Sequence, residues 1–144
     1  MTRDTLRQTV DVSPRPGVET FVVGGGHLGH DIARRLVAKG RSVTVIGSTP
    51  MADPPPNLEV EHVDVLDETA LLPIGLSDDP TVLAVTGSDS TNLLVAQLAR
   101  VTYDAERVLV RVNDPRRASA FHALGVEVVN ASATLGRIIA EERL

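Results

Sequence analysis

A glycine-rich segment directly behind a short apolar run constrains the fold of this chain more than any other feature. Residues 21–23 are Phe-Val-Val, and residues 24–29 read Gly-Gly-Gly-His-Leu-Gly, which matches the pattern G-x-G-x-x-G. Apolar side chains then recur at helical spacing until Lys39-Gly40. This order predicts a strand, a tight turn, and a helix that begins at the turn.

The rest of the chain repeats this alternation of strand and helix. Residues 43–46 (VTVI) form a second β-branched run, which completes a βαβ unit with parallel strands. Further strands are predicted near residues 58–63, 82–85, 108–112 and 126–129. Six strands separated by helices predict an α/β fold, a doubly wound parallel six-stranded sheet of the Rossmann type with order 3-2-1-4-5-6. Such sheets bind ligands beside the carboxyl end of the first strand.

Two helices are expected in the middle of the chain. Asp67-Glu68 opens a short helix through residues 71–72, which Pro73 and Gly75 limit. Residues 88–90 (SDS) form a polar capping turn ahead of a second helix. Its apolar face is assigned to Leu93, Leu94, Leu98 and Val101.

Two more helices are expected near the end of the chain. Asp114-Pro115 starts the first, because Asp caps helices and Pro fits the first helical position. Ser132 caps the second, which carries an apolar stripe of Leu135, Ile138 and Ile139. That stripe packs either on its own sheet or on a partner subunit.

Length and composition set the domain organisation. At 144 residues the chain has the length of one domain. Residues 1–18 are polar and end in Ser-Pro-Arg-Pro-Gly, which predicts a flexible tail. Residues 19–144 are then a single Rossmann-type nucleotide-binding domain. Because only 2% of the residues are aromatic, its core must be built from Val, Leu, Ile and Ala.

Charge and cysteine content bear on partners and location. A net charge of -5 argues against a nucleic-acid partner, since nucleic acid requires a basic face. The chain contains no Cys, so it offers no disulfide and no thiolate site, which fits a cytoplasmic location. No stretch approaches the roughly 18 uninterrupted apolar residues of a membrane span.

The glycines of residues 24–29 have separate physical roles. Gly24 permits the sharp turn, and Gly26 lets a diphosphate approach the backbone. Gly29 lets the helix pack closely on the strand. The helix N-terminus adds free N–H groups and the positive end of a dipole. In this context the pattern indicates a dinucleotide or mononucleotide site.

The second strand lacks the acidic residue that usually holds the ribose hydroxyls about 20 residues after the glycines. The strand ends in Gly47-Ser48, and the nearest acid, Asp53, lies beyond Pro50. NAD, NADP, a simple adenine nucleotide and a loss of binding all remain open.

Other polar residues follow later strands and allow two interpretations each. Residues 86–92 (TGSDSTN) either only cap the next helix or also lie along the nucleotide. Asp64 is either a turn residue or a contact on the adenine side. Arg111 is either solvated or ion-paired, or it contacts a phosphate or a partner.

No motif for catalysis is present in the sequence. The four histidines show neither H-E-x-x-H spacing nor a matching carboxylate pattern, so a metal site is not expected. There is no G-x-S-x-G elbow and no Lys after the glycines as in a P-loop. No catalytic residue is therefore assigned, and the chain is not expected to be an enzyme.

Three segments together resemble the TrkA-N domain, also called the N-terminal RCK domain, a regulator of potassium channels and transporters. Residues 21–29 (FVVGGGHLG) are similar to the family's first strand and turn, and residues 85–94 (VTGSDSTNLL) to its fourth strand and turn. Residues 111–115 (RVNDP), with the apolar pattern that follows, resemble its fifth strand, helix and sixth strand.

This resemblance implies a nucleotide site and a set of residues for it. The ligand is NAD(H) or a related adenine nucleotide, with NADP, ATP, ADP and AMP as candidates. In the family an acid follows the second strand, where this chain has Gly or Ser. Carried over by position, the site residues are Gly24, Gly26, His27, Leu28, Gly29, Gly47, Ser48, Asp64, Val65, Thr86 and Gly87.

The resemblance also implies a role and partners. It predicts a regulatory subunit or domain for potassium transport, present as a homodimer or higher homo-oligomer and bound to a membrane channel or transporter. One alternative is a fragment of a nicotinamide-dependent oxidoreductase. Another is a TrkA-N module that regulates a non-channel partner such as a hydrolase.

Overall fold

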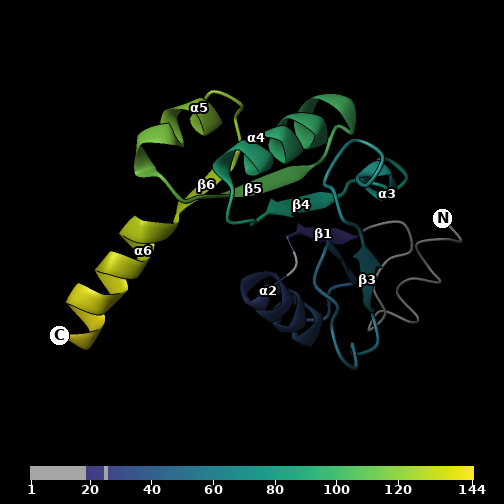
Figure 1. Ribbon diagram of the computed structural model, residues 1–144, viewed down its shortest axis with the longest axis horizontal. Coiled ribbons are helices and arrows are strands. Elements are labelled where there is room, and N and C mark those ends of the chain that lie inside the picture. Colours follow the sequence, from purple (N-terminus) through teal and green to yellow (C-terminus); the bar gives the residue numbers. More distant parts are fainter. Residues whose placement is uncertain (1–18, 25) are drawn as a thin grey trace, which may run out of the picture.

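The computed structural model describes residues 19–24 and 26–144 and contains a six-stranded parallel sheet of order β3-β2-β1-β4-β5-β6 (Figure 1). The predicted strand order is thus confirmed. The tail expected at residues 1–18 lies outside the described residues. The strands are β1 (Thr20–Val23), β2 (Val43–Gly47), β3 (Leu58–His62), β4 (Thr81–Ala84), β5 (Arg107–Val112) and β6 (Glu127–Asn130).

Helices cover both faces of the sheet, as a doubly wound fold requires. Figure 1 shows α2 on one side, α4 and α5 on the other, and α6 extending away from the body towards the C-terminus. The helices are α2 (His27–Ala38), α3 (Leu72–Gly75), α4 (Asp89–Gln97), α5 (Ala118–His122) and α6 (Ala131–Arg137). Further helical turns are η1 (Leu98–Thr102), η2 (Pro115–Arg117) and η3 (Ile138–Arg143). No helix in the described part of the chain is long and apolar enough to cross a membrane.

The core consists of two apolar layers, one on each face of the sheet. Every residue of β1 and β2 is buried, because central parallel strands have helices on both sides. Val22 and Val45 face α2, where they pack with Ala33. Phe21 and Ile46 face the layer beneath α4. The paucity of aromatic residues therefore leaves a Val-rich core, as expected.

The buried face of α4 and η1 matches the predicted one only in part, because Leu93 and Leu98 pack against the core whereas the other two predicted residues are exposed. Leu94 is 41% exposed and Val101 is 78% exposed, whereas Val95, Ala96 and Ala99 are fully buried. The segment is apolar on nearly all sides, so periodicity alone did not select a face. Small side chains face the sheet because they let the helix axis approach it closely.

Two helix starts also differ from the sequence-based expectation. Asp67 does not open α3 but accepts a hydrogen bond from Ala70 N in the preceding turn. Helix α3 begins later, with Pro73 in its first turn, where a missing N–H is tolerated. The cap of α6 is Asn130 rather than Ser132, because the helix follows β6 directly and Asn130 accepts from Ala133 N.

Candidate nucleotide-binding site

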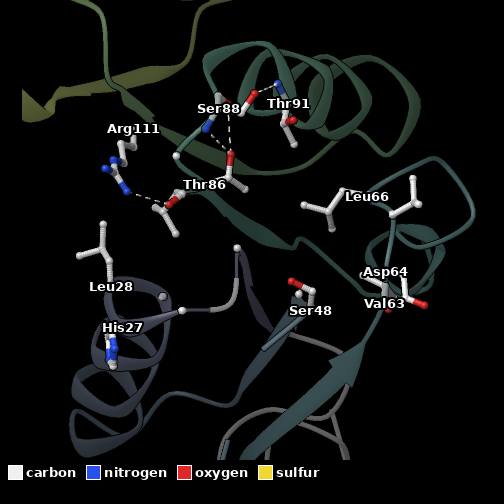
Figure 2. A pocket seen from close by; sticks show the side chains of 17 residues that line it. His27, Leu28, Ser48, Val63, Asp64, Leu66, Thr86, Ser88, Thr91 and Arg111 are labelled. Atoms are coloured by element: carbon white, nitrogen blue, oxygen red, sulfur yellow. Dashed lines mark hydrogen bonds between the residues drawn. The ribbon is translucent and has the colours of Figure 1, made fainter. Parts of the chain in front are cut away.

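A cavity of about 710 Å³ lies at the carboxyl edge of the sheet, over β1, β2 and β4. Figure 2 shows Leu28 and Arg111 at one end and Ser48 and Asp64 at the other. The structure places all eleven predicted site residues around this one cavity: Gly24, Gly26, His27, Leu28, Gly29, Gly47, Ser48, Asp64, Val65, Thr86 and Gly87.

The glycine turn has backbone geometry that side chains would disturb. Gly24 has φ +125° and Gly26 has φ +117°, in the region that favours glycine. A Cβ at Gly29 would lie 1.8 Å from the carbonyl oxygen of Gly24, so this glycine permits the close helix–strand contact. A Cβ at Gly26 would meet no atom within 4 Å. The backbone at Gly26 is therefore open to the cavity.

The N-terminus of α2 is available to an anion. Gly26 occupies the cap position, no side chain of the described residues caps the helix, and its first turn holds no acidic residue. The ring of His27 points away from the space between Ser48 and Thr86 (Figure 2). First-turn N–H groups of a helix are unpaired within the helix and attract phosphate.

The end of β2 presents small groups instead of a carboxylate. Gly47 is buried and Ser48 is exposed, and both line the cavity. The register places Gly47 beside His62 of β3, whose Nε2 lies 3.0 Å from the carbonyl oxygen of Ser48. The acid among the lining residues is Asp64, after β3. Ribose hydroxyls at β2 would thus meet backbone and hydroxyl groups.

The opposite wall is a polar network behind β4. The buried Asn92 side chain accepts hydrogen bonds from the Thr86 N–H (3.0 Å) and the Thr86 hydroxyl (2.6 Å). Asn92 Nδ2 donates to the carbonyl oxygens of Thr86 (3.0 Å) and Arg111 (2.9 Å). Asn92 thereby joins the ends of β4 and β5 and fixes the Thr86-Gly87 wall of the cavity.

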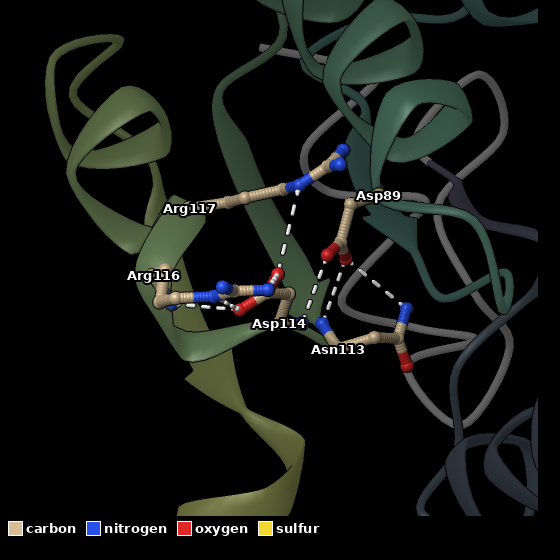
Figure 3. Close-up of polar contacts among 5 residues, drawn as sticks. All are labelled: Asp89, Asn113, Asp114, Arg116 and Arg117. Atoms are coloured by element: carbon tan, nitrogen blue, oxygen red, sulfur yellow. Dashed lines mark hydrogen bonds and ion pairs between the residues drawn. The ribbon is translucent and has the colours of Figure 1, made fainter.

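A second clamp holds the next loop (Figure 3). The Asp89 carboxylate, 9% exposed, accepts from the backbone N–H groups of Asn113 (2.7 Å) and Asp114 (2.9 Å) and from Asn113 Nδ2 (3.1 Å). Burial raises the pKa of Asp89, but these hydrogen bonds, with the charge of Arg117, outweigh burial and lower it. Asp89 is therefore ionised in the fold and ties α4 to the end of β5.

A neighbouring carboxylate belongs to the same loop. Asp114 caps η2 by accepting from Arg116 N, and the Arg116 guanidinium binds both of its oxygens. These hydrogen bonds lower the pKa of Asp114 to about 2. The predicted capping role of Asp114 is confirmed.

The comparison with known protein families identifies this arrangement. Residues 20–131 match the family model of the TrkA-N domain. This chain belongs to the TrkA-N domain family.

Relatives with the same domain show how much of a longer protein the match spans. The chain is 32% identical over 129 residues to the Trk system potassium uptake protein TrkA of Mycobacterium tuberculosis H37Rv. The match covers 87% of this chain and 59% of that protein. The chain thus spans little more than half of this curated relative.

Solved structures share the fold at low sequence identity. The NAD(P)-binding domain of an exopolyphosphatase-related protein from Archaeoglobus fulgidus superimposes with TM-score 0.71 and 22% identity, covering 87% of this chain and 96% of that one. The Kef C-terminal domain of Shewanella denitrificans in AMP-bound form gives 0.69 and 20% identity, covering 85% and 79%. Both likenesses concern the fold of this TrkA-N domain.

Six further residues of this TrkA-N domain line the cavity: three were not predicted there, and three were predicted there only as one of two alternatives. Val63, Leu66 and Val85 are apolar strand-end residues that no motif distinguishes. Ser88 and Thr91 belong to the cap segment: Ser88 accepts from Thr91 N, and both also line the cavity. Capping and cavity lining therefore coincide there. The sixth is Arg111.

The ionisable groups of the TrkA-N domain do not assemble a metal centre within residues 19–24 and 26–144. No three His, Asp or Glu side chains of this part lie close enough together to hold an ion.

Proposed function

We propose that this TrkA-N domain is a regulatory module that binds an adenine nucleotide and thereby controls potassium transport. The observation that carries the proposal is the single cavity in which the glycine turn and the uncapped start of α2 face the ends of β2, β3 and β4. The name of the related TrkA, a potassium uptake protein, supplies the process.

We assign the nucleotide's phosphates to Gly26, His27 and Leu28, at the start of α2, which no side chain of the described residues caps. Its adenosine half is placed at Ser48, Asp64 and Val65, towards β2 and β3. Because no carboxylate ends β2, binding of the ribose there relies on weaker hydrogen bonds. NAD(H), NADP(H), ATP, ADP and AMP are the candidate ligands.

We further propose that the domain forms a homo-oligomer. This oligomer binds the cytoplasmic side of a membrane subunit that transports potassium. Helix α6 buries none of its residues in the described chain. Leu135 is 59% exposed and Ile139, in the following turn, is 48% exposed. This apolar stripe supports the partner-subunit alternative over packing on the domain's own sheet.

A regulatory role is favoured over an oxidoreductase because the cavity offers few groups for proton transfer. Its ionisable lining residues are His27, Asp64 and Arg111, and the His27 ring points away. Regulation of a hydrolase is the second candidate, prompted by the name of the exopolyphosphatase-related relative in fold. A nucleotide would act in either case by its different affinity for two domain arrangements.

The test is calorimetric titration of the chain with ATP, ADP, AMP, NADH and NADPH, repeated with Gly87→Val. Gly87 lines the cavity, has an ordinary φ, and offers open space to a Cβ, so a Val there fills the ligand's place without strain. Gly136→Val is the matched control, because Gly136 also has open space but lies in α6, outside this cavity.

We expect the wild type and Gly136→Val to bind at least one nucleotide and Gly87→Val to bind at least about 100-fold more weakly, roughly the loss of 2.7 kcal/mol. Thermal melting checks that all three fold. A folded wild type that binds none of the five nucleotides, or unchanged affinity in Gly87→Val, would overturn the proposal.

A further inference from the structure

Arg111 occupies the end of the cavity farthest from Ser48 and Asp64 (Figure 2). It is the next-to-last residue of β5 and lines two hollows: the nucleotide cavity, and an apolar groove of about 300 Å³ that Leu109, Leu135 and Ile138 also line. Among the described lining residues of the cavity, Asp64 and Arg111 carry the formal charges at neutral pH. Arg111 thus supplies the fixed positive side-chain charge.

The guanidinium of Arg111 is poorly satisfied by the protein. Its Nε is buried and has no hydrogen-bond partner among the described residues, and Nη1 lies 3.4 Å from the carbonyl oxygen of Val85, a long contact. No carboxylate of the described chain pairs with it. By contrast, Arg107 of the same strand binds Glu127, and Arg116 binds Asp114.

The position of Arg111 follows from strand alternation. Val108, Val110 and Val112 face the buried layer beneath α4, so Leu109 and Arg111 face the opposite side, where α2 begins. Figure 2 shows the Arg111 side chain above Leu28. The guanidinium and the open N-terminus of α2 therefore border the same end of the cavity, and both attract negative charge.

We propose that Arg111 makes this site select nucleotides by the charge beyond the α-phosphate, with the terminal phosphates of a nucleoside triphosphate as its preferred partner. This rests on the proposed function, since it concerns the same bound nucleotide. With adenosine over β2 and β3, phosphates added beyond the first extend past α2 towards β5. A partly buried guanidinium without a carboxylate partner gains new charge-assisted hydrogen bonds there.

The experiment measures ATP, ADP and AMP affinities by calorimetry without magnesium, at one pH and ionic strength. Four proteins are compared: wild type, Arg111→Met, Arg111→Lys and Arg107→Met. Arg107→Met is the matched control, because it removes the same charge from the other end of β5, where the side chain is exposed. Arg111→Lys keeps the charge and loses the fork of donors.

In wild type and Arg107→Met we expect ATP to bind about tenfold more tightly than AMP, with ADP between them, as one charge-assisted hydrogen bond allows. In Arg111→Met the ratio falls to about two, and Arg111→Lys lies between, because a point charge replaces a bidentate one. AMP affinity changes little in any variant.

The outcomes separate this inference from the site itself. Equal ATP and AMP affinities in the wild type, or an undiminished ratio in Arg111→Met, overturn the role of Arg111 while nucleotide binding stands. A wild type that binds none of the three overturns the role of Arg111, and the proposed function falls with it only if NADH and NADPH also fail to bind. If Arg111→Met fails to fold, the ratio of ATP to AMP affinity is compared between the wild type and Arg111→Lys. Equal ratios in these two proteins overturn the role of the guanidinium fork.

Discussion

Of the helices that begin at the carboxyl edge of this sheet, α2 and α4 have N-termini that differ in how they are capped. Helix α2 starts at a glycine cap, without a side-chain cap in the described chain and without an acid in its first turn. Helix α4 starts with Ser88, whose hydroxyl accepts from Thr91 N, and has Asp89 in its first turn. The N-terminus of α2 is therefore open to a ligand, whereas the N-terminus of α4 is capped by side chains of the protein.

This difference in capping indicates that the α2 end is suited to binding an anion, whereas the α4 end stabilises the wall of the cavity. The α4 end is neutralised by Asp89, which also holds the loop after β5, so its polar residues stabilise the wall of the cavity. The α2 end follows a glycine turn, and the backbone of that turn is open to the cavity at Gly26. Leaving a helix end unsatisfied costs stability, which a bound anion recovers.

The largest expected effect comes from closing the contact that shapes the α2 end. Gly29→Ala places a Cβ 1.8 Å from the Gly24 carbonyl oxygen, so backbone must move. We expect the free energy of unfolding to fall by about 3 kcal/mol, the upper end of overpacking effects, with loss of nucleotide binding. Urea unfolding and calorimetry measure the two losses.

Gly136→Ala is the control for a glycine-to-alanine change within a helix. The added Cβ at position 136 meets no atom within 4 Å. We expect the free energy of unfolding to rise by about 0.5–1 kcal/mol, because glycine inside a helix is less stable than alanine. If Gly29→Ala were as stable as the wild type, the close contact would not be what requires glycine there.

A smaller effect is expected at the filled α4 end. Asp89→Asn removes the charge that binds the N–H groups of Asn113 and Asp114, and should lower the free energy of unfolding by about 1–2 kcal/mol at pH 7. Because the folded-state pKa of Asp89 lies below its unfolded value, its stabilisation is complete above about pH 4. It is lost as the pH falls through the folded-state pKa.

Urea unfolding of wild type and Asp89→Asn from pH 7 to pH 2.5 tests this sign. The difference between the two proteins should shrink only below about pH 4. Asp31→Asn is the control: Asp31 forms an exposed pair with Arg35, and its loss should cost about 0.5 kcal/mol or less. A difference that grows on acidification would contradict the assigned role of Asp89.

The smallest effect on stability is expected from an acidic residue in the first turn of α2, which would then resemble the first turn of α4. His27→Asp puts a negative charge in the first turn of α2 and should stabilise the nucleotide-free domain by about 0.3–1 kcal/mol. The same charge should weaken nucleotide binding by about tenfold, because it repels phosphate. His27→Asn, similar in shape but neutral, is the control. Equal binding by the two variants would mean that the phosphates lie elsewhere.

The residues predicted on the α2 side lie at the cavity, because glycine at positions 24, 26 and 29 is required by backbone geometry that is local in the chain. All eleven predicted residues lie at one cavity for the same reason: parallel strands bring their carboxyl ends to one edge. Sequence reasoning misplaced part of the buried face of α4 and η1 and the caps of α3 and α6, where several neighbouring residues were equally suitable.

The sequence by itself determined the alternation of strands and helices and the open glycine turn, since these follow from hydrophobic periodicity and backbone sterics. It also predicted the strand order, through the Rossmann-type pattern of a glycine turn inside a βαβ unit. Only the tertiary structure decided which polar residues form hydrogen bonds with each other. Asn113 Nδ2 donates a hydrogen bond to Asp89, and Asn92 Nδ2 donates one to the backbone carbonyl of Arg111, across sequence separations that no local pattern encodes. Among the residues that the structure describes, the fold also brings no carboxylate within reach of Arg111.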